Sequence, residues 1–105
     1  MSSRLDANHH FISLLLETTT VQARALLYTL SEDQVLVLRE IAHNLNTLPL
    51  PVKVKKEVLK SEKLLTKLGT SKGSWKSKRI LIENNYKKLS QLFITAKPLL
   101  KTLLP

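Results

Sequence analysis

Apolar residues recur three and four positions apart along most of the chain, and this spacing restricts the fold more than any other feature. In the clearest stretch, residues 32–45, the side chains of Val35, Leu38 and Ile41 fall on one side of a helix, together with Ala42 and Leu45. The chain has only two glycines and no Asn-Gly or Asp-Gly pair that would turn a hairpin. The sequence therefore predicts an all-α protein, a compact bundle of five or six short helices.

Capping signals and helix breakers set the expected boundaries. Asp6 is a plausible N-cap for the first helix, and Ser31 and Gln34 have the spacing of a capping box. The segment 48–51, with prolines at 49 and 51, predicts an extended hinge, and Pro98 predicts a kink in the last helix or a separate final turn. The expected helices are residues 6–18, 21–29, 32–45, 52–68, 75–84 and 86–104.

Two of these helices carry more specific expectations. In the helix 21–29, Val21 and Ala25 should face the interior together with Leu26 or Leu27. The helix 75–84 should carry its cations on the first turn, with Ile80, Leu81 and Ile82 behind them. Gly69 is placed to end the helix before the loop 69–74, and Ser74 to cap the helix after it.

Charge divides the chain at the hinge. Residues 1–50 hold three basic and five acidic side chains, a balance of −2, whereas residues 51–105 hold fourteen basic and three acidic ones, a balance of +11. A length of 105 residues suits one domain, 1–105, with an acidic-to-neutral half over 1–48 that supplies much of the core and a basic half over 52–105. The asymmetry predicts a polyanionic partner, nucleic acid first and an anionic membrane second.

The basic half places its lysines in a pattern. At 100° per residue, five lysines of the helix 52–68 fall within about 80° of one another, opposite an apolar stripe of Val54, Val58, Leu65 and Leu68. Such a ridge suits phosphate neutralisation, and lysine, a mobile point charge, suits backbone contacts more than base reading. The alternative is a solvated helix face. The predicted phosphate contacts are Lys53, Lys56, Lys60, Lys63, Lys67, Lys72, Lys76, Lys78 and Arg79.

Two neighbouring features have a functional and an ordinary interpretation. Trp75 either offers a stacking platform for bases or anchors the start of its helix to the core, and the second interpretation is favoured. The loop 69–74 either cradles a phosphate with its amides or simply joins two helices; it lacks the spacing of a Walker A loop.

No catalytic, metal-binding or cofactor site is expected. The absence of cysteine excludes disulfides, thiolate-bound zinc and a thiol nucleophile. His9, His10 and His43 lack partners at ligand spacing, and no nucleophile and base are positioned by a motif. The prediction is a protein that is not an enzyme.

The C-terminal segment 87–105 is amphipathic. It should pack on the helix 32–45 and complete the bundle. Alternatively, it binds another protein through Leu99 and Leu103, either a second copy of the chain or a virion protein. The chain would then be a structural or adaptor protein. Membrane contact is a third possibility.

Several segments together resemble a small basic protein of Polinton (Maverick) elements and adintoviruses. They are RALL at 24–27, LREIAHNL at 38–45, PLP at 49–51, KLLTKL at 63–68, and SWKSKRIL at 74–81 with the apolar end that follows. Where that family has a Gly-Gly step before the tail, this chain has Asn84-Asn85-Tyr86. The resemblance implies a virion or core component that touches packaged DNA and implies no catalytic residues.

The start of the chain lacks the pattern of a secretory signal, and no run reaches the roughly 18 apolar residues of a membrane span. We therefore expect an intracellular protein, nuclear or packaged in a virion, whose partner is DNA before RNA.

Overall fold

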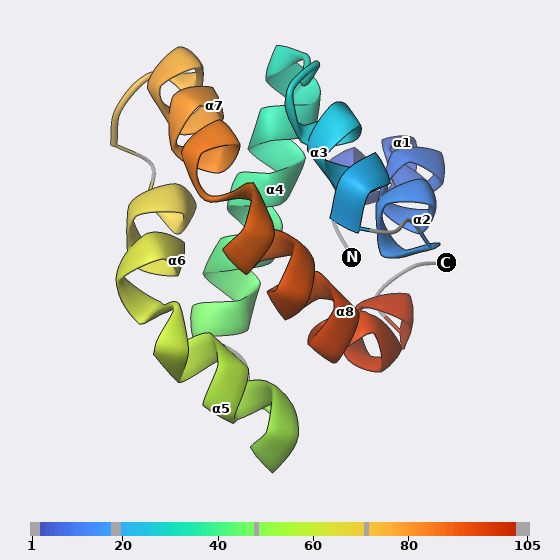
Figure 1. Ribbon diagram of the computed structural model, residues 1–105, viewed down its shortest axis with the longest axis vertical. Helices are drawn as coiled ribbons and strands as arrows, with labels where there is room; N and C mark the ends of the chain where they lie inside the picture. Colours follow the sequence, from blue (N-terminus) through green and yellow to red (C-terminus); the bar gives the residue numbers. More distant parts are fainter. Residues whose placement is uncertain (1–2, 18–19, 48, 71, 103–105) are drawn as a thin grey trace.

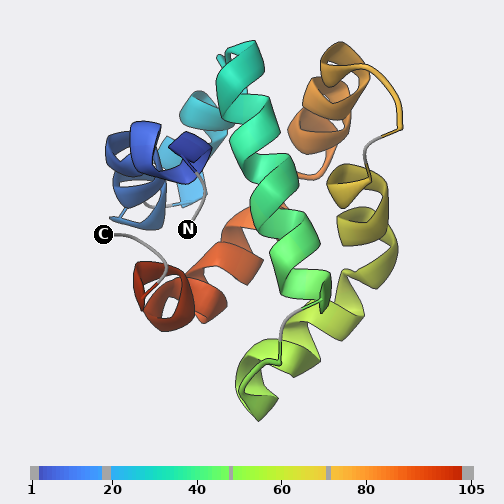
Figure 2. The same cartoon turned by 180° about the vertical axis from the view of Figure 1, so that it is seen from behind.

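Helix α4 (Glu32–Thr47) runs through the middle of the bundle, and α6 (Glu62–Gly69), α7 (Trp75–Asn84) and α1 (Ser3–Ala7) pack against it (Figure 2). The computed structural model describes residues 3–17, 20–47, 49–70 and 72–102. The five apolar residues predicted to face inward from this helix are all buried: Val35, Leu38, Ile41, Ala42 and Leu45. A single apolar stripe thus set the orientation of the longest helix of the N-terminal half.

Within these residues the fold is all-α, as predicted, with eight helices rather than five or six and no strand (Figure 1). The two additional helices arise because two predicted helices are each divided, the first at Asn8 and the other at Ser61. The helices other than α4 are α1 (Ser3–Ala7), α2 (His9–Glu17), α3 (Thr20–Leu27), α5 (Val52–Lys60), α6 (Glu62–Gly69), α7 (Trp75–Asn84) and α8 (Tyr86–Thr102).

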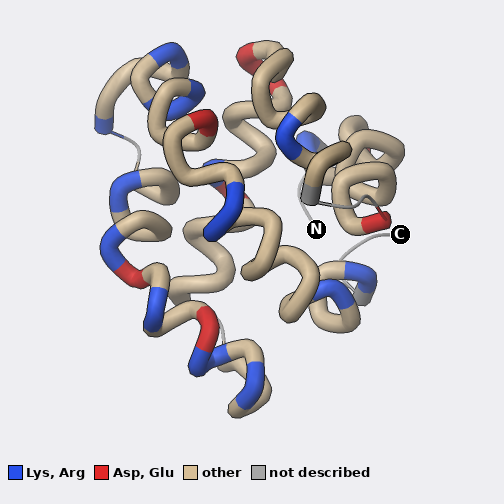
Figure 3. The backbone as a smooth tube through the Cα atoms, viewed as in Figure 1, with Lys and Arg blue, Asp and Glu red and all other residues tan. Residues whose placement is uncertain are grey.

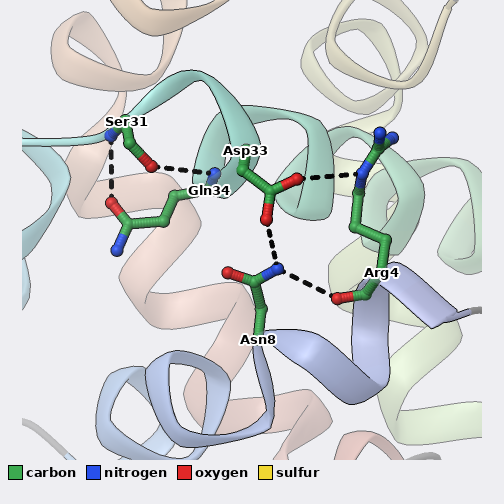
Figure 4. Close-up of polar contacts among 5 residues, drawn as sticks. All are labelled: Arg4, Asn8, Ser31, Asp33 and Gln34. Atoms are coloured by element: carbon green, nitrogen blue, oxygen red, sulfur yellow. Dashed lines mark hydrogen bonds and ion pairs between the residues drawn. The ribbon is translucent and has the colours of Figure 1, made fainter.

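The start of α4 is fixed by the predicted capping box, which the structure confirms (Figure 4). The Ser31 amide donates to Gln34 Oε1 at 3.0 Å, and the Gln34 amide donates to Ser31 Oγ at 3.2 Å. Asp33, in the first turn, accepts from Arg4 Nε at 3.2 Å and from Asn8 Nδ2 at 2.6 Å. These bonds tie α1 to α4 and hold Asn8 at the break between α1 and α2. Asp6 lies inside α1, so its prediction as an N-cap is wrong.

Both halves of the chain contribute to one hydrophobic core, but α3 presents a different face from the predicted one. Ala23 and Leu27, one helical turn apart, are buried. Val21 is 80 % exposed and Ala25 is exposed, so the prediction that these two residues face inward is wrong. A helix of eight residues carries too short a pattern to fix its own rotation, and contact with α7 and α8 decides it.

The closest helix contact joins α6 to α4. A Cβ atom on Gly69 would lie 2.9 Å from the His43 backbone nitrogen, inside van der Waals contact. Glycine at this position therefore lets the end of α6 approach the backbone of α4. The predicted role of Gly69 as the residue that ends the helix needs a small correction, since Gly69 is the last helical residue and Thr70 is the cap.

The C-terminal helix α8 completes the bundle, as the favoured interpretation predicted. Leu89, Leu92, Phe93, Ala96 and Leu100 are buried. Its principal neighbours are α3, α5 and α2, not α4 as predicted. Pro98 lies within the helix, which bends near its C-terminal end (Figure 1).

Two ion pairs join the end of α8 to the end of α2. Lys97 Nζ lies 3.1 Å and Lys101 Nζ 2.8 Å from the carboxylate oxygens of Glu17. Hydrogen bonding to Lys101, then to Lys97, and the charges of both lower the pKa of Glu17 below its ordinary 4.5. Across the described ranges, no helix has the length and hydrophobicity that crossing a bilayer requires.

Candidate nucleic-acid interface

Seven of the nine predicted phosphate contacts are exposed lysines of α5, α6, the loop that follows and α7. We call this set the basic face: Lys53, Lys56, Lys60, Lys63, Lys67, Lys72 and Lys76. Figure 3 shows lysine and arginine segments recurring along these three helices, and those of α6 follow the outer edge of the molecule. The three consecutive helices α5, α6 and α7 therefore lie on the same side of the bundle.

The basic face is not the single straight ridge that the sequence predicted. The helix predicted over 52–68 breaks at Ser61, whose φ of −113° and ψ of 19° depart from helical values and whose amide bonds to Val58 O. The break lets α5 pack on α8 while α6 packs on α4. The apolar stripe is buried as predicted: Val54, Val58, Leu65 and Leu68.

On either side of the break the lysines keep helical neighbour spacing. Lys56 and Lys60 are four residues apart on α5, and Lys63 and Lys67 are four apart on α6. Each pair is separated by about 6 Å along its helix axis, at 1.5 Å per residue. This separation brings neighbouring ammonium groups within reach of successive phosphates of one strand.

Few carboxylates neutralise the basic face. Lys60 Nζ pairs with Glu57 at 3.3 Å, and this pair is three residues apart and exposed, so it contributes little to stability and is easily exchanged. The other six lysines have no carboxylate within 4.0 Å among the residues that the structure describes. Their charges are therefore available to an external anion.

Lys78 does not belong to the basic face, and its prediction as a phosphate contact is wrong. The residue is 4 % exposed. Its ammonium donates to three backbone carbonyls at the end of α6: Lys67 at 3.2 Å, Leu68 at 3.1 Å and Thr70 at 2.6 Å. Burial, and secondarily the positive charge of Arg39, lower the pKa of Lys78 below its ordinary value. Lys78 thus caps α6 from the neighbouring helix, where carbonyls and the helix dipole favour a cation.

Burial of Lys78 also changes the predicted inner face of α7. Lys78 and Ile82, one turn apart, form that face, whereas Ile80 is 54 % exposed. The N-terminus of α7 follows the prediction, since the Ser77 amide donates to Ser74 Oγ at 3.1 Å. In the preceding loop the Lys72 amide bonds to Thr70 Oγ1, so this amide already has a partner.

Arg79 and Trp75 are less available than the lysines. The Trp75 ring is half-buried and packs against the hydrophobic core, in keeping with its interpretation as an anchor. Lys76 Nζ and the Arg79 guanidinium lie 6.0 Å and 5.7 Å from the ring centroid. Arg79 also forms an ion pair with Glu83 at 3.6 Å, with its Nε buried and without a hydrogen bond. Arg79 is thus committed to contacts within α7.

Sequence reasoning missed a second cationic group, on α3 and at the start of α8. The Arg24 guanidinium lies 5.4 Å from the ring centroids of both Tyr28 and Tyr86, and the two rings meet edge to face at 6.2 Å. The four-residue spacing of Arg24 and Tyr28 is a signal for a helical pair. Nothing in the sequence indicates that Tyr86, 58 residues later than Tyr28 (86 − 28), joins them.

Across the described part of the chain, no three histidine or carboxylate side chains gather in a way that could hold a metal ion. Searches for similar proteins found no family model, no curated protein and no solved structure that matches the chain.

Proposed function

We propose that this protein is a non-enzymatic DNA-binding protein that contacts the phosphate backbone through the basic face, with little sequence preference. The observation that carries the proposal is the set of seven exposed lysines along α5, α6, the following loop and α7, six of which have no carboxylate partner among the described residues. Polyanion binding of this kind gains free energy from the release of condensed counterions. Residues 51–105 add a balance of +11, which attracts a polyanion at long range.

The chemistry of the face supports backbone contact rather than base reading. All seven side chains are lysines, whose ammonium groups lack the planar fork that reads guanine edges. The one arginine predicted for the site, Arg79, is engaged by Glu83 and Trp75. The molecule measures 32 × 28 × 28 Å, so it would cover about one turn of duplex, roughly 34 Å.

The resemblance to the small basic protein of Polinton elements and adintoviruses suggests a biological role for this binding. That role is the organisation or packaging of a viral or mobile-element genome. The adaptor alternative has less support, because five apolar residues of α8 fill the core and Glu17 holds the end of the helix, although Ile94 is 48 % exposed. Leu99 is only partly exposed, and Leu103 lies outside the described residues.

The test measures the affinity for labelled duplex DNA across a salt series, with two unrelated sequences and a duplex RNA of the same length. The logarithm of the binding constant should fall linearly with the logarithm of the salt concentration, by about 0.9 per phosphate engaged. The variant Lys56→Gln/Lys60→Gln/Lys63→Gln should flatten the slope by up to about 2.7. The two DNA sequences should bind alike, and DNA should bind at least as well as RNA.

The control is Lys97→Gln/Lys101→Gln, which removes two lysines that are paired with Glu17. It removes lysines from the C-terminal end of α8, which Figure 3 places across the molecule from α6. The control should keep the wild-type slope. Equal slopes for the wild type and the triple variant, or equal flattening in the control, would refute the basic face as the binding surface.

A further inference from the structure

Arg24, Tyr28 and Tyr86 form a compact group of two aromatic rings and one guanidinium, which we call the tyrosine cluster. Arg24 and Tyr28 lie on α3 and directly after it, and Tyr86 begins α8. The guanidinium is 5.4 Å from both ring centroids, and the rings are inclined at 68°. Two segments far apart in the sequence thus place their aromatic side chains against one cation.

The cluster is anchored on one side and open on the other. Tyr86 packs against the hydrophobic core, which fixes the position of its ring. Tyr28 is 44 % exposed and Arg24 is exposed. Part of the Tyr28 ring therefore faces solvent, and contacts with Arg24 and Tyr86 limit its rotation.

The surroundings of the cluster are cationic. Lys87 and Lys88 directly follow Tyr86 and are both exposed. Among the residues that the structure describes, none of Arg24, Lys87 and Lys88 has a carboxylate within 4.0 Å. The Tyr28 ring, held beside the Arg24 guanidinium, offers a stacking surface, and the exposed Lys87 and Lys88, next to Tyr86 in the sequence, add positive charges for phosphate contacts.

We propose that the tyrosine cluster binds single-stranded nucleic acid, with an unpaired base stacked on Tyr28 and adjacent phosphates contacted by Arg24, Lys87 and Lys88. Stacking on a tyrosine face needs a base that is not already covered by its neighbours, so an unpaired strand fits and an intact duplex does not. Every base has such a face, and recognition would therefore tolerate any sequence.

This surface uses none of the residues of the basic face. The cluster lies on α3 and the start of α8, whereas the basic face lies on α5, α6 and α7; in Figure 1, α3 and α8 lie in front of α4. The two proposals rest on different residues, so either can fail while the other holds.

The test uses a labelled oligothymidylate, an oligouridylate of the same length and a DNA duplex, with the full chain at low salt. Tyr28→Ala should weaken binding to the single strands about fivefold or more, the loss expected when one stacked base loses its platform. Tyr28→Phe, which keeps the ring, should bind within twofold of the wild type, and Arg24→Gln should weaken binding to the single strands. Affinity for the duplex should be unchanged in all three variants. Ultraviolet crosslinking to a bromouracil-substituted strand should label Tyr28.

Four results of the strand-binding experiments would overturn the proposal. They are single-strand affinity that stays within twofold in Tyr28→Ala, an equal loss in Tyr28→Phe, an equal loss for the duplex, and crosslinks that map only to the basic face. Circular dichroism confirms that each variant is folded. A parallel experiment with phosphatidylserine-containing vesicles tests an anionic membrane as the competing partner. If the protein binds these vesicles in a way that depends on Tyr28 and does not bind the single strands, the cluster is a membrane-binding site and the proposal is wrong. Comparison of the two single strands shows whether DNA or RNA is preferred.

Discussion

Replacement of Lys78 by methionine should destabilise the protein, although the sequence presents this residue as one more surface lysine. The change keeps most of the stem that crosses from α7 to α6 and removes the ammonium. Three carbonyls of α6 and its cap, at 2.6–3.2 Å, lose their donor. They are among the carbonyls that no amide of the helix itself can satisfy.

The magnitude follows from the surroundings of each carbonyl. The bond to Leu68 O is buried, and an unsatisfied buried acceptor costs about 1–3 kcal/mol. The bonds to Lys67 O and Thr70 O are only partly buried, so water can replace the ammonium at a net cost of about 0.5–1.5 kcal/mol each. Burial of the charged ammonium costs free energy, which is why the pKa of Lys78 is lowered. The methionine variant avoids this cost, and the gain offsets part of the loss. We expect a decrease of about 2–4 kcal/mol in the free energy of unfolding.

Urea denaturation followed by circular dichroism and by Trp75 fluorescence measures this change, because Trp75 begins the helix that carries Lys78. The matched control is Lys76→Met, an exposed lysine of the same helix, which should change stability by less than about 0.5 kcal/mol. Lys78→Arg should not restore full stability, since a planar guanidinium cannot direct three N–H groups to carbonyls arranged around a single nitrogen. Equal stability of Lys78→Met and Lys76→Met would refute the capping role.

Two further predictions concern the packing of α6 and the attachment of α8. Gly69→Ala should lower the free energy of unfolding by about 1–3 kcal/mol, because the new methyl group would meet the His43 backbone at 2.9 Å; urea denaturation measures this loss, and a stabilised variant would contradict it. The lowered pKa of Glu17 means that its ion pairs stabilise the fold above pH 4.5 and cease to do so as the pH falls through the folded-state value. Glu17→Gln should therefore melt below the wild type at pH 7, and the difference between the two melting temperatures should shrink as the pH is lowered below 4.5; a difference that does not shrink in acid would contradict this assignment.

Elements with strong local signals could be predicted from the sequence. The capping box at Ser31 and Gln34, the inner face of α4 and the cap at Ser74 all formed as expected. Each depends on residues within one or two turns of one another, and their geometry follows from helix periodicity alone. The exposure of the five basic-face lysines of α5 and α6 follows for the same reason, because the apolar stripe behind them is buried.

Other features depended on contacts between distant segments. The break at Ser61 divides the predicted ridge because α5 and α6 pack on different helices. Val21 turned outward because α3 is too short to set its own rotation. The tyrosine cluster joins Arg24 and Tyr28 to Tyr86, which no sequence spacing relates to them.

The sequence by itself determined that the chain is helical, where α4 begins and that a cationic half follows the hinge at residues 48–51, because these properties reside in local periodicity and composition. Only the tertiary structure decided that one of the predicted phosphate contacts, Lys78, is withdrawn from solvent. Lys76 and Lys78 are two residues apart on one helix, yet one is exposed and the other is buried against the end of α6. Three carbonyls of α6 and its cap residue made the difference, since they accept hydrogen bonds from a buried ammonium that periodicity alone would place in water.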